Sequence, residues 1–529
     1  MLKSKHGCWT CRLRRKRCDE VHPACTACAS RNITCHGYGD KPDWMDGGDS
    51  EKIEAKRIKK EIQSNLRLKN EKSNRADTES QYQPNGGQYR GDDIMVPLLA
   101  VDSNSVHAFV NTHAGTRREI SDKITSYREA ELLMHYMDYV FPLQFRFHTP
   151  DVSGRGWLMW LLVKTGPLYH AALSLSALHQ SIYFSNVFGN TYAELSVYHA
   201  KALRDLQQFL HHLQISEDGD EKSRQIEVMA CGVSLISFEL FQGGVSDWQL
   251  HLNALISILT SRSSSSLAEM LGGTQETNGT RKGSPHWQQT ASSFFITVIL
   301  WFDLLACAST GQAPRMPYRY LIDSNIVNMS NYMGVQNWAM RAIGDIAALS
   351  VWKDNSGGHD FELISQGQAI EQGLEDGLRS LDNISLLGAS VMTTNLSTQQ
   401  NKVPGVTRAF ATAALVQLRT VLYGSTTTSH PIRDVVARNI EAMKSIHDEQ
   451  DFRGLVWPIC ISGSMAEAAQ QPFYESIVKE VLGDKTRDFG NCATILQILT
   501  RCWEMRRLDP HSSVRWVSAM AEIGTCLLV

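Results

Sequence analysis

The chain has 529 residues, a length that excludes a single compact core and indicates two to three folding units. Hydrophobic residues make up 43%, which is ordinary for a globular protein. The formal charge of −3 hides an asymmetry, because residues 1–75 carry 18 Lys and Arg against 10 Asp and Glu. This first segment is therefore +8 and the remainder −11. A basic N-terminal segment followed by an acidic body indicates that the N-terminal segment binds a polyanion.

No secretory signal is expected at the start, since Lys3, Lys5 and His6 are followed by further charge instead of an apolar run. We therefore expect an intracellular, reducing compartment in which disulfides do not form. The most apolar segment, residues 294–308, is shorter than the roughly 20 residues of a membrane-spanning helix and contains Asp303. The sequence predicts a core helix there and no membrane partner.

Residues 1–40 form a small cysteine-rich unit with almost no apolar core, so something other than hydrophobic burial must hold it together. Residues 41–120 are expected to be a linker that ends in a polar, disordered segment at 73–117. Within the linker, residues 51–72 predict a short charged helix with apolar positions at Ala55, Ile58, Ile62 and Leu66. Two hypotheses stay open for this helix: a homodimer seam of barely two heptads, or a solvated helix.

A large all-helical regulatory domain is predicted over residues 121–529. It opens on Ser126-Tyr-Arg-Glu129, a capping box that is followed by apolar residues on one helical face. Clean period-two alternation bounded by hairpin signals is absent from the sequence, so no strands are expected. A Ser-, Gly- and Thr-rich stretch predicts a loop at 261–284. Further helices are predicted at 167–184, 192–213, 226–241, 248–259, 293–308, 406–422, 433–447 and 493–506.

Six of the twelve cysteines lie within residues 8–35, where the half Cys-x₂-Cys-x₆-Cys is used twice. The other six are scattered through apolar segments, where cysteine usually behaves as a small buried hydrophobe. A structural zinc site takes four soft ligands in a tetrahedron, so two separate sites would need eight thiolates. Six suffice if two cysteines bridge both metals, and the pseudo-symmetry of the halves favours the first of each, Cys8 and Cys25. The rival interpretations, a disulfide knot or unconnected buried cysteines, agree less well with the spacing and a reducing compartment.

The cysteine spacing, the basic run at 12–17 and the Pro23 between the halves resemble the fungal binuclear zinc cluster (Zn₂Cys₆) transcription factors. Stretches of the body such as Val140-Phe-Pro-Leu-Gln-Phe145 are similar to the fungus-specific transcription factor domain of those proteins. That likeness implies a helical regulatory region that contacts the transcription machinery. For the cluster, the resemblance implies two zinc ions, one held by Cys8, Cys11, Cys18 and Cys25 and the other by Cys8, Cys25, Cys28 and Cys35.

Charge indicates what the cluster is for. The window between Cys11 and Cys18 is basic at five of its six positions: Arg12, Arg14, Arg15, Lys16 and Arg17. The matching window of the second half has only Arg31. Symmetric ligands with asymmetric charge predict that the first helix contacts double-stranded DNA, with Lys5 as a further cation, while the second helix scaffolds it. The competing hypothesis is a run that serves only phosphate binding or nuclear import.

By the same resemblance, Arg15 stands where the family has a lysine that contacts a guanine of a CGG triplet, with Arg14 beside it. Arginine can form two hydrogen bonds to guanine O6 and N7 in the major groove. Arginine in place of lysine is a departure from the family pattern, and it bears on triplet preference.

The sequence thus predicts a nuclear, sequence-specific transcription regulator that binds CGG-like half-sites, alone or as a homodimer through residues 51–72. Family members often govern metabolic or secondary-metabolite gene sets. A second hypothesis is an enzyme tethered to DNA. The sequence contains no P-loop, His-Glu-x-x-His or Gly-x-Ser-x-Gly motif, so we do not expect an enzyme. A third, a cluster used only for protein contacts, conflicts with the basic first helix. The body histidines 170, 179, 199, 211 and 212 are expected to be helix residues and not metal ligands.

Overall fold

The structure is a computed structural model, which describes residues 7–14, scattered positions between 16 and 58 that include all six clustered cysteines, and the body from residue 126. The body is described except at 150–153, 165, 184–190, 216–220, 246, 261–285, 357–359, 389–399, 425–429, 483–488 and 510–512. The predicted loop at 261–284 and nearly all of the predicted linker lie outside the described residues. Of the predicted helix at 51–72, only Glu51 and Ile58 are described. The chain divides into two units, residues 1–96 and 97–529. Every regular element among the described residues is helical, which confirms the predicted fold class.

The N-terminal unit has two short helices, α1 (Trp9–Leu13) and α2 (Thr26–Ala29), which pack against each other. Its core is made of cysteines together with Ile33 and Ile58, and Ile58 is fully buried. Ile58 is one of the four apolar positions of the predicted 51–72 helix. Sulfur therefore takes the place of the aliphatic side chains that fill the core of a larger domain.

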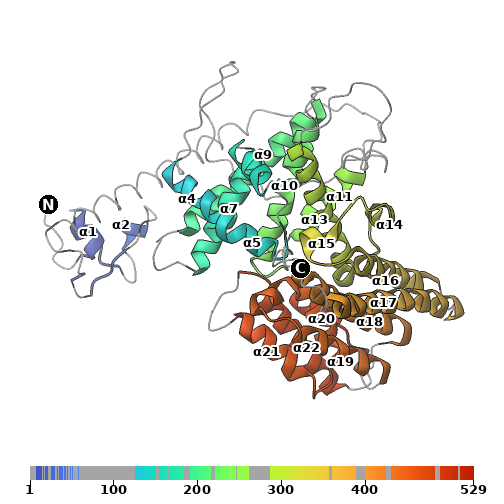
Figure 1. Cartoon of the computed structure of the whole chain (residues 1–529). Helices are drawn as coiled ribbons and strands as arrows, with labels where there is room; N and C mark the ends of the chain where they lie inside the picture. Colours follow the sequence, from blue (N-terminus) through green and yellow to red (C-terminus); the bar gives the residue numbers. More distant parts are fainter. Residues whose placement is uncertain are drawn as a thin grey trace, which may run out of the picture. The chain divides into compact units, whose positions relative to one another are not determined.

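The first part of the body begins at the predicted capping box, where the Ser126 hydroxyl accepts from the Glu129 backbone and the Glu129 carboxylate accepts from the Ser126 backbone. In Figure 1 this part runs from cyan through yellow. Its elements are α4 (Tyr127–His135), the π-helical turn η2 (Tyr136–Val140), α5 (Phe141–Gln144), α6 (Gly156–Val163), α7 (Pro167–Tyr183), α9 (Thr191–Ile215), α10 (Glu221–Leu240), α11 (Trp248–Thr260), α13 (His286–Thr310), α14 (Tyr318–Asp323) and α15 (Met329–Met333).

The second part of the body is coloured from yellow to red in Figure 1 and extends almost to the C-terminal residue. Within it, α18 packs against α16, α17, α19 and α20. Its elements are α16 (Asn337–Ser356), α17 (Asp360–Gly388), the 3₁₀ turn η3 (Gln400–Lys402), α18 (Val403–Tyr423), α19 (His430–Lys444), the 3₁₀ turn η4 (Glu449–Gly454), α20 (Val456–Ser464), α21 (Gln471–Leu482), α22 (Cys492–Leu508) and α23 (Trp516–Ile523).

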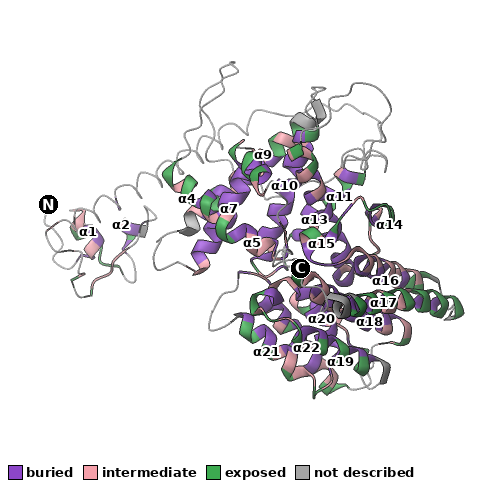
Figure 2. Cartoon of the chain, in the orientation of Figure 1, coloured by how far each residue is buried: buried purple, intermediate pink, exposed green. Residues whose placement is uncertain are grey.

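Helix α13 lies at the centre of the body. It packs against α10 and α11, which precede it in the chain, and against α16 and α23, which follow it. By length and composition alone it could cross a membrane, but 94% of its most apolar window is buried inside the protein (Figure 2). Its one charge, Asp303, is 2% exposed and accepts hydrogen bonds from the backbone of Arg315 (2.8 Å) and Met316 (2.9 Å). The prediction of a core helix is confirmed, and the buried carboxylate has the partners that burial demands.

All eight helices predicted by residue range in the body are present, with ends that shift by at most seven residues, at the start of α13. Helices α16 and α17 were not predicted. The sequence of α17 carries glycines that weaken a helical pattern, and Gly377 shows why one is there. A Cβ at Gly377 would lie 2.5 Å from the Trp338 ring of α16, so the two helices approach too closely for any larger residue.

A partly buried ion cluster joins the two parts of the body. Asp451 of η4, only 2% exposed, accepts from Arg146 Nε (2.9 Å), which follows α5, and from Lys402 Nζ (2.8 Å) at the start of α18. Asp448 accepts from the same two cations, at 2.6 Å and 3.2 Å. Two carboxylates thus neutralise two cations that come from segments far apart in the chain.

Candidate metal centre and nucleic-acid interface

The six clustered cysteines place their sulfurs in two groups of four. Within each group all Sγ atoms lie within 4.8 Å of one another, and Cys8 and Cys25 belong to both groups. The other members are Cys11 and Cys18 in one group and Cys28 and Cys35 in the other. The structure therefore brings together every predicted ligand, in the two sets that the family resemblance implies. Their assignment as zinc ligands stays a prediction.

The spacing of the sulfurs suits a shared cation and not a disulfide. The Sγ atoms of Cys8 and Cys11 each lie 3.6 Å from that of Cys25, whereas a disulfide bond is about 2.05 Å long. Sulfurs bound tetrahedrally to one zinc at about 2.3 Å would be about 3.8 Å apart. All six are free thiols, so the donor set fits two tetrahedral sites that share two ligands.

Burial sets the electrostatics of these thiols. Loss of solvation raises the pKa of Cys8, Cys11 and Cys28 well above the usual value of a thiol. Without a cation, these groups would keep their protons at neutral pH. A zinc ion displaces those protons, and two ions against six thiolates still leave two negative charges. A basic helix beside the cluster offsets that excess.

Local hydrogen bonds fold the two halves onto each other. Cys8 caps α1, because its Sγ accepts from the Cys11 backbone (3.4 Å). Thr10, fully buried, hydrogen-bonds through its hydroxyl to Nδ1 of His36 and accepts from the His36 backbone, both at 2.9 Å. In the second half, both carboxylate oxygens of Asp19 accept from the backbone of Thr26 at 3.1 Å, and hydrogen bonding by Thr26 lowers the pKa of Asp19.

The predicted DNA-contacting residues are only partly described. Arg12 and Lys16 are exposed, as a contact with DNA requires, whereas Arg14 is half-buried and its Nη1 is covered without a hydrogen-bond partner. Lys5, Arg15 and Arg17 lie outside the described residues, as does Pro23.

Trp9 is a contributor that the sequence did not single out. Its indole Nε1 donates to the Gly39 carbonyl (2.9 Å), and the guanidinium carbon of Arg12 lies 4.6 Å from the centre of its ring. One feature of the sequence could have identified Trp9: it is a lone aromatic residue on the basic helix of a unit that is otherwise poor in aromatics.

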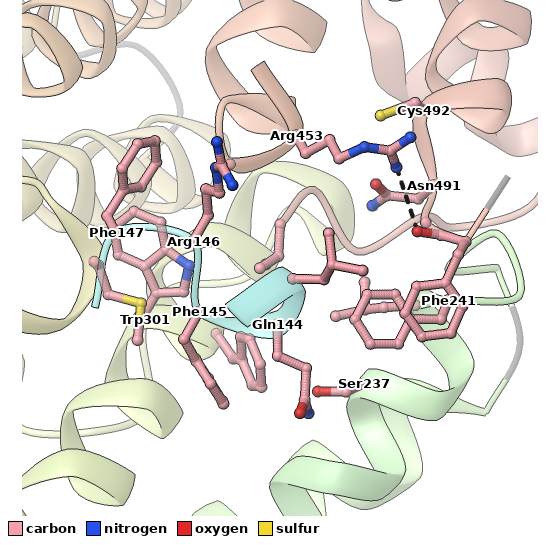
Figure 3. Close-up of a pocket in the computed structure, with 18 of the residues that line it drawn as sticks. Gln144, Phe145, Arg146, Phe147, Ser237, Phe241, Trp301, Arg453, Asn491 and Cys492 are labelled. Carbon is pink, nitrogen blue, oxygen red and sulfur yellow. Dashed lines mark hydrogen bonds between the residues drawn. The ribbon is translucent and has the colours of Figure 1, made fainter. Parts of the chain in front are cut away.

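The body contains a second candidate site, a cavity of about 70 Å³ between α5, α10, α13 and the start of α22 (Figure 3). The Gln144 side chain lines it, and both polar atoms of this amide are buried without a hydrogen-bond partner. Arg453 lines the other end and donates to the carbonyl of Phe489 (3.4 Å). Aspartate and glutamate do not occur among the described lining residues. Aromatic side chains form part of the wall: Phe145, Phe147, Phe241, Trp301, Phe302, Tyr332 and Phe489.

Three of the body histidines named from the sequence contact other side chains. His170 Nδ1 lies 2.5 Å from an Asp205 oxygen, and His179 is hydrogen-bonded to His135 (2.9 Å). His199 stacks on Phe238 with ring centres 4.1 Å apart. Among the described residues, the side-chain groups that could hold a metal ion are the two cysteine groups.

Two family models match the chain. The fungal Zn(2)-Cys(6) binuclear cluster domain matches residues 6–45, which include all six clustered cysteines. The fungal specific transcription factor domain matches residues 131–529, which include the helical body from within α4 onward.

Two of three similar proteins cover nearly the whole chain, and the third covers 78% of it. It is 29% identical to the pestheic acid cluster transcriptional regulator 3 of Pestalotiopsis fici, over 96% of this chain and 95% of that protein. It is 28% identical to the transcription factor dibT of Pestalotiopsis microspora, over 100% and 99% of the two chains. It is 32% identical to the trichothecene biosynthesis transcription regulator TRI10 of Trichoderma arundinaceum, over 78% of this chain and all of that protein. No solved structure matches the chain.

Proposed function

The chain belongs to the fungal specific transcription factors and carries their Zn(2)-Cys(6) binuclear cluster, and on this premise we propose which residues bind zinc and DNA. The protein is a DNA-binding transcription regulator whose cluster domain binds two zinc ions. We assign the six clustered cysteines as the ligands, with Cys8 and Cys25 bridging both ions. The observation that carries this assignment is the pair of sulfur groups that share those two residues.

The proposed DNA contacts are the cations on and around α1: Lys5, Arg12, Arg14, Arg15, Lys16 and Arg17. The two zinc ions hold α1 rigidly against the second half, which lets a five-residue helix keep its shape without a core of its own. Neutralisation of phosphates by these cations supplies most of the affinity, so binding falls steeply as salt rises. The exposure of Arg12 and Lys16 supports this role.

We assign the sequence preference to contacts that Arg15, with Arg14 beside it, makes with bases of CGG-like half-sites in the major groove. A two-pronged arginine–guanine contact discriminates against the wrong base by about 1–3 kcal/mol. The remaining cations contact phosphate and position the helix without selecting sequence.

The relatives indicate the class of genes. One is named for the pestheic acid cluster and another for trichothecene biosynthesis. We therefore propose that this protein acts in the nucleus on a secondary-metabolite gene set, that its helical body contacts the transcription machinery, and that it is not an enzyme. The proposed domains are residues 1–40, 41–120 and 121–529.

A homodimer through residues 51–72 would place two copies of the cluster on paired half-sites. Ile58 would belong to the seam of such a dimer, yet it is fully buried in the cluster unit of one chain. This burial favours a single cluster on one half-site. Light scattering of the full chain, with and without DNA, distinguishes one copy from two.

The proposed function is tested by the affinity of the full chain for a CGG-containing duplex and for a duplex with the triplet scrambled, measured by fluorescence anisotropy. Wild-type protein is expected to prefer the first, and Arg15→Ala to lose that preference by about ten- to a hundredfold while it retains non-specific binding. Arg31→Ala, in the second half, is the matched control and should keep the preference. An equal loss by Arg15→Ala on both duplexes would place Arg15 on phosphate.

A further inference from the structure

Tyr38 comes soon after the sixth clustered cysteine and reaches back to the segment that follows the third. Its ring is half-buried and packs against the cysteine core. Its hydroxyl donates to the Val21 carbonyl (2.9 Å), and the hydroxyl oxygen lies 3.6 Å from Sγ of Cys18. One side chain thus contacts both ends of the segment 18–21.

The segment 18–21 needs such support, because its backbone is strained. Glu20 has a φ of 59°, a left-handed conformation that is unfavourable for most residues other than glycine. A conformation of this kind persists where the surrounding structure holds it. Asp19 holds it from one side, since both of its carboxylate oxygens accept from the first backbone N–H of α2 at 3.1 Å. Tyr38 holds it from the other, and Cys18 at its start is placed by both.

The Tyr38 hydroxyl has a second partner in the sulfur of Cys18. A Cys18 that binds zinc is a thiolate, which accepts hydrogen bonds and has no proton to donate. Tyr38 is then the donor to that sulfur as well as to the Val21 carbonyl, an arrangement in which two acceptors share one proton. The same sulfur also accepts from the Cys8 backbone N–H (3.4 Å). Hydrogen bonds to a metal ligand fix its orientation and contribute to metal affinity.

Cys18 belongs to one sulfur group only, the group that contains Cys11 and lacks Cys28 and Cys35. Cys11 and Cys18 flank the basic run at 12–17. The zinc ion assigned to this group therefore anchors both ends of the segment that carries the proposed DNA contacts.

We propose that Tyr38 is a positioning residue for zinc, which holds Cys18 in place and slows the loss of the ion assigned to Cys8, Cys11, Cys18 and Cys25. This inference rests on the ligand assignment of the proposed function and adds a residue that is not itself a ligand. Tyr38 acts through Cys18, so its effect is confined to one of the two ions.

The test compares Tyr38→Phe with wild type in the full chain after addition of excess chelator. Thiols that lose their zinc ion are trapped by alkylation and located by peptide mass spectrometry. Phenylalanine keeps the ring but lacks the hydroxyl, so Cys11 and Cys18 should be alkylated about tenfold faster than in wild type, the lower end of the effect of such hydrogen bonds on metal affinity. Cys28 and Cys35 should react at the wild-type rate. Tyr127→Phe, which changes an exposed tyrosine of α4, is the matched control and should leave all rates unchanged.

The pattern of alkylation separates positioning from a general effect on the fold. Equal acceleration at Cys18 and Cys35 would show that Tyr38 supports the whole unit, and unchanged rates would show that the hydroxyl does nothing for zinc; either result overturns the inference. If Tyr38→Phe is purified with one ion and protected Cys28 and Cys35, the inference stands, whereas a chain without zinc would overturn it. A wild-type chain with fewer than two ions would overturn the proposed ligands and this inference together.

Discussion

The two sulfur groups predict that cysteine substitutions fall into two classes by zinc content. Cys25 belongs to both groups, so Cys25→Ser leaves each site with three sulfurs. Cys11 belongs to one group, so Cys11→Ser leaves the other group with its four sulfurs intact. The expected zinc content is therefore two ions per chain for wild type, one for Cys11→Ser and none for Cys25→Ser.

The energetic consequence is large, because a structural zinc ion contributes about 10–16 kcal/mol of binding free energy that also stabilises the fold. The loss of both ions should unfold the cluster unit, whereas the loss of one leaves a closed tetrahedral site. Native mass spectrometry of the full chain counts the ions directly. Cys307→Ser is the matched control: this buried cysteine of α13 donates to the Asp303 carbonyl, which serine can also do, and the variant should keep two ions. Equal zinc contents for Cys25→Ser and Cys11→Ser would refute the assignment of Cys25 as a bridge.

Three further predictions concern the body. Asp451→Asn keeps the shape but removes the buried charge between Arg146 and Lys402, and it should lower the free energy of unfolding by about 3 kcal/mol in urea denaturation. Gln144→Leu replaces an amide that is buried without partners, and it should raise stability by about 1–3 kcal/mol in the same assay. Burial lowers the pKa of His199 to about 4, so the unfolded chain takes up this proton at a higher pH than the folded chain does. Stability should therefore fall by up to about 3 kcal/mol as the pH drops from 6.5 to 4, and His199→Phe should flatten that dependence.

Each of these has an outcome that contradicts it. Asp376→Asn, in an exposed pair with Arg379, is the control for the ion cluster and should leave the denaturation midpoint unchanged. An equal effect of Asp376→Asn and Asp451→Asn would show that burial of the carboxylate does not determine how much the ion pair stabilises the fold. Destabilisation by Gln144→Leu would mean that the amide has a partner in solution. An unchanged pH slope in His199→Phe would assign the dependence to another group, such as His251, whose pKa burial also lowers.

The parts of the fold that the sequence predicted are those governed by local chemistry. The capping box at Ser126 requires only residues three apart, and its two hydrogen bonds are present. Ligand counting predicted that two of the six cysteines are shared, since a tetrahedral ion needs four donors wherever they lie in the chain. The two sets of four came from the family resemblance. Helices α7, α10 and α13 were predicted from apolar segments, and these helices lie in the core.

The parts that it missed depend on contacts between distant segments. Helix α17 contains glycines whose use is visible only where Trp338 of α16 approaches Gly377. Asp303 was noted as a charge within an apolar run, but its partners, at 315 and 316, follow the end of α13 and could not be predicted from periodicity. The hydrogen bonds of Trp9 likewise go to carbonyls 28 and 30 residues away, at Gly37 and Gly39.

The central claim, that the zinc cluster directs this protein to specific DNA, is tested most directly by chromatin mapping with the tagged full chain and its Cys25→Ser variant. We expect wild-type protein to concentrate at sites that share a CGG-containing motif beside genes of a biosynthetic cluster, and the variant to lose that enrichment. Wild-type signal spread without a common motif, or the same enrichment in Cys25→Ser, would contradict the account.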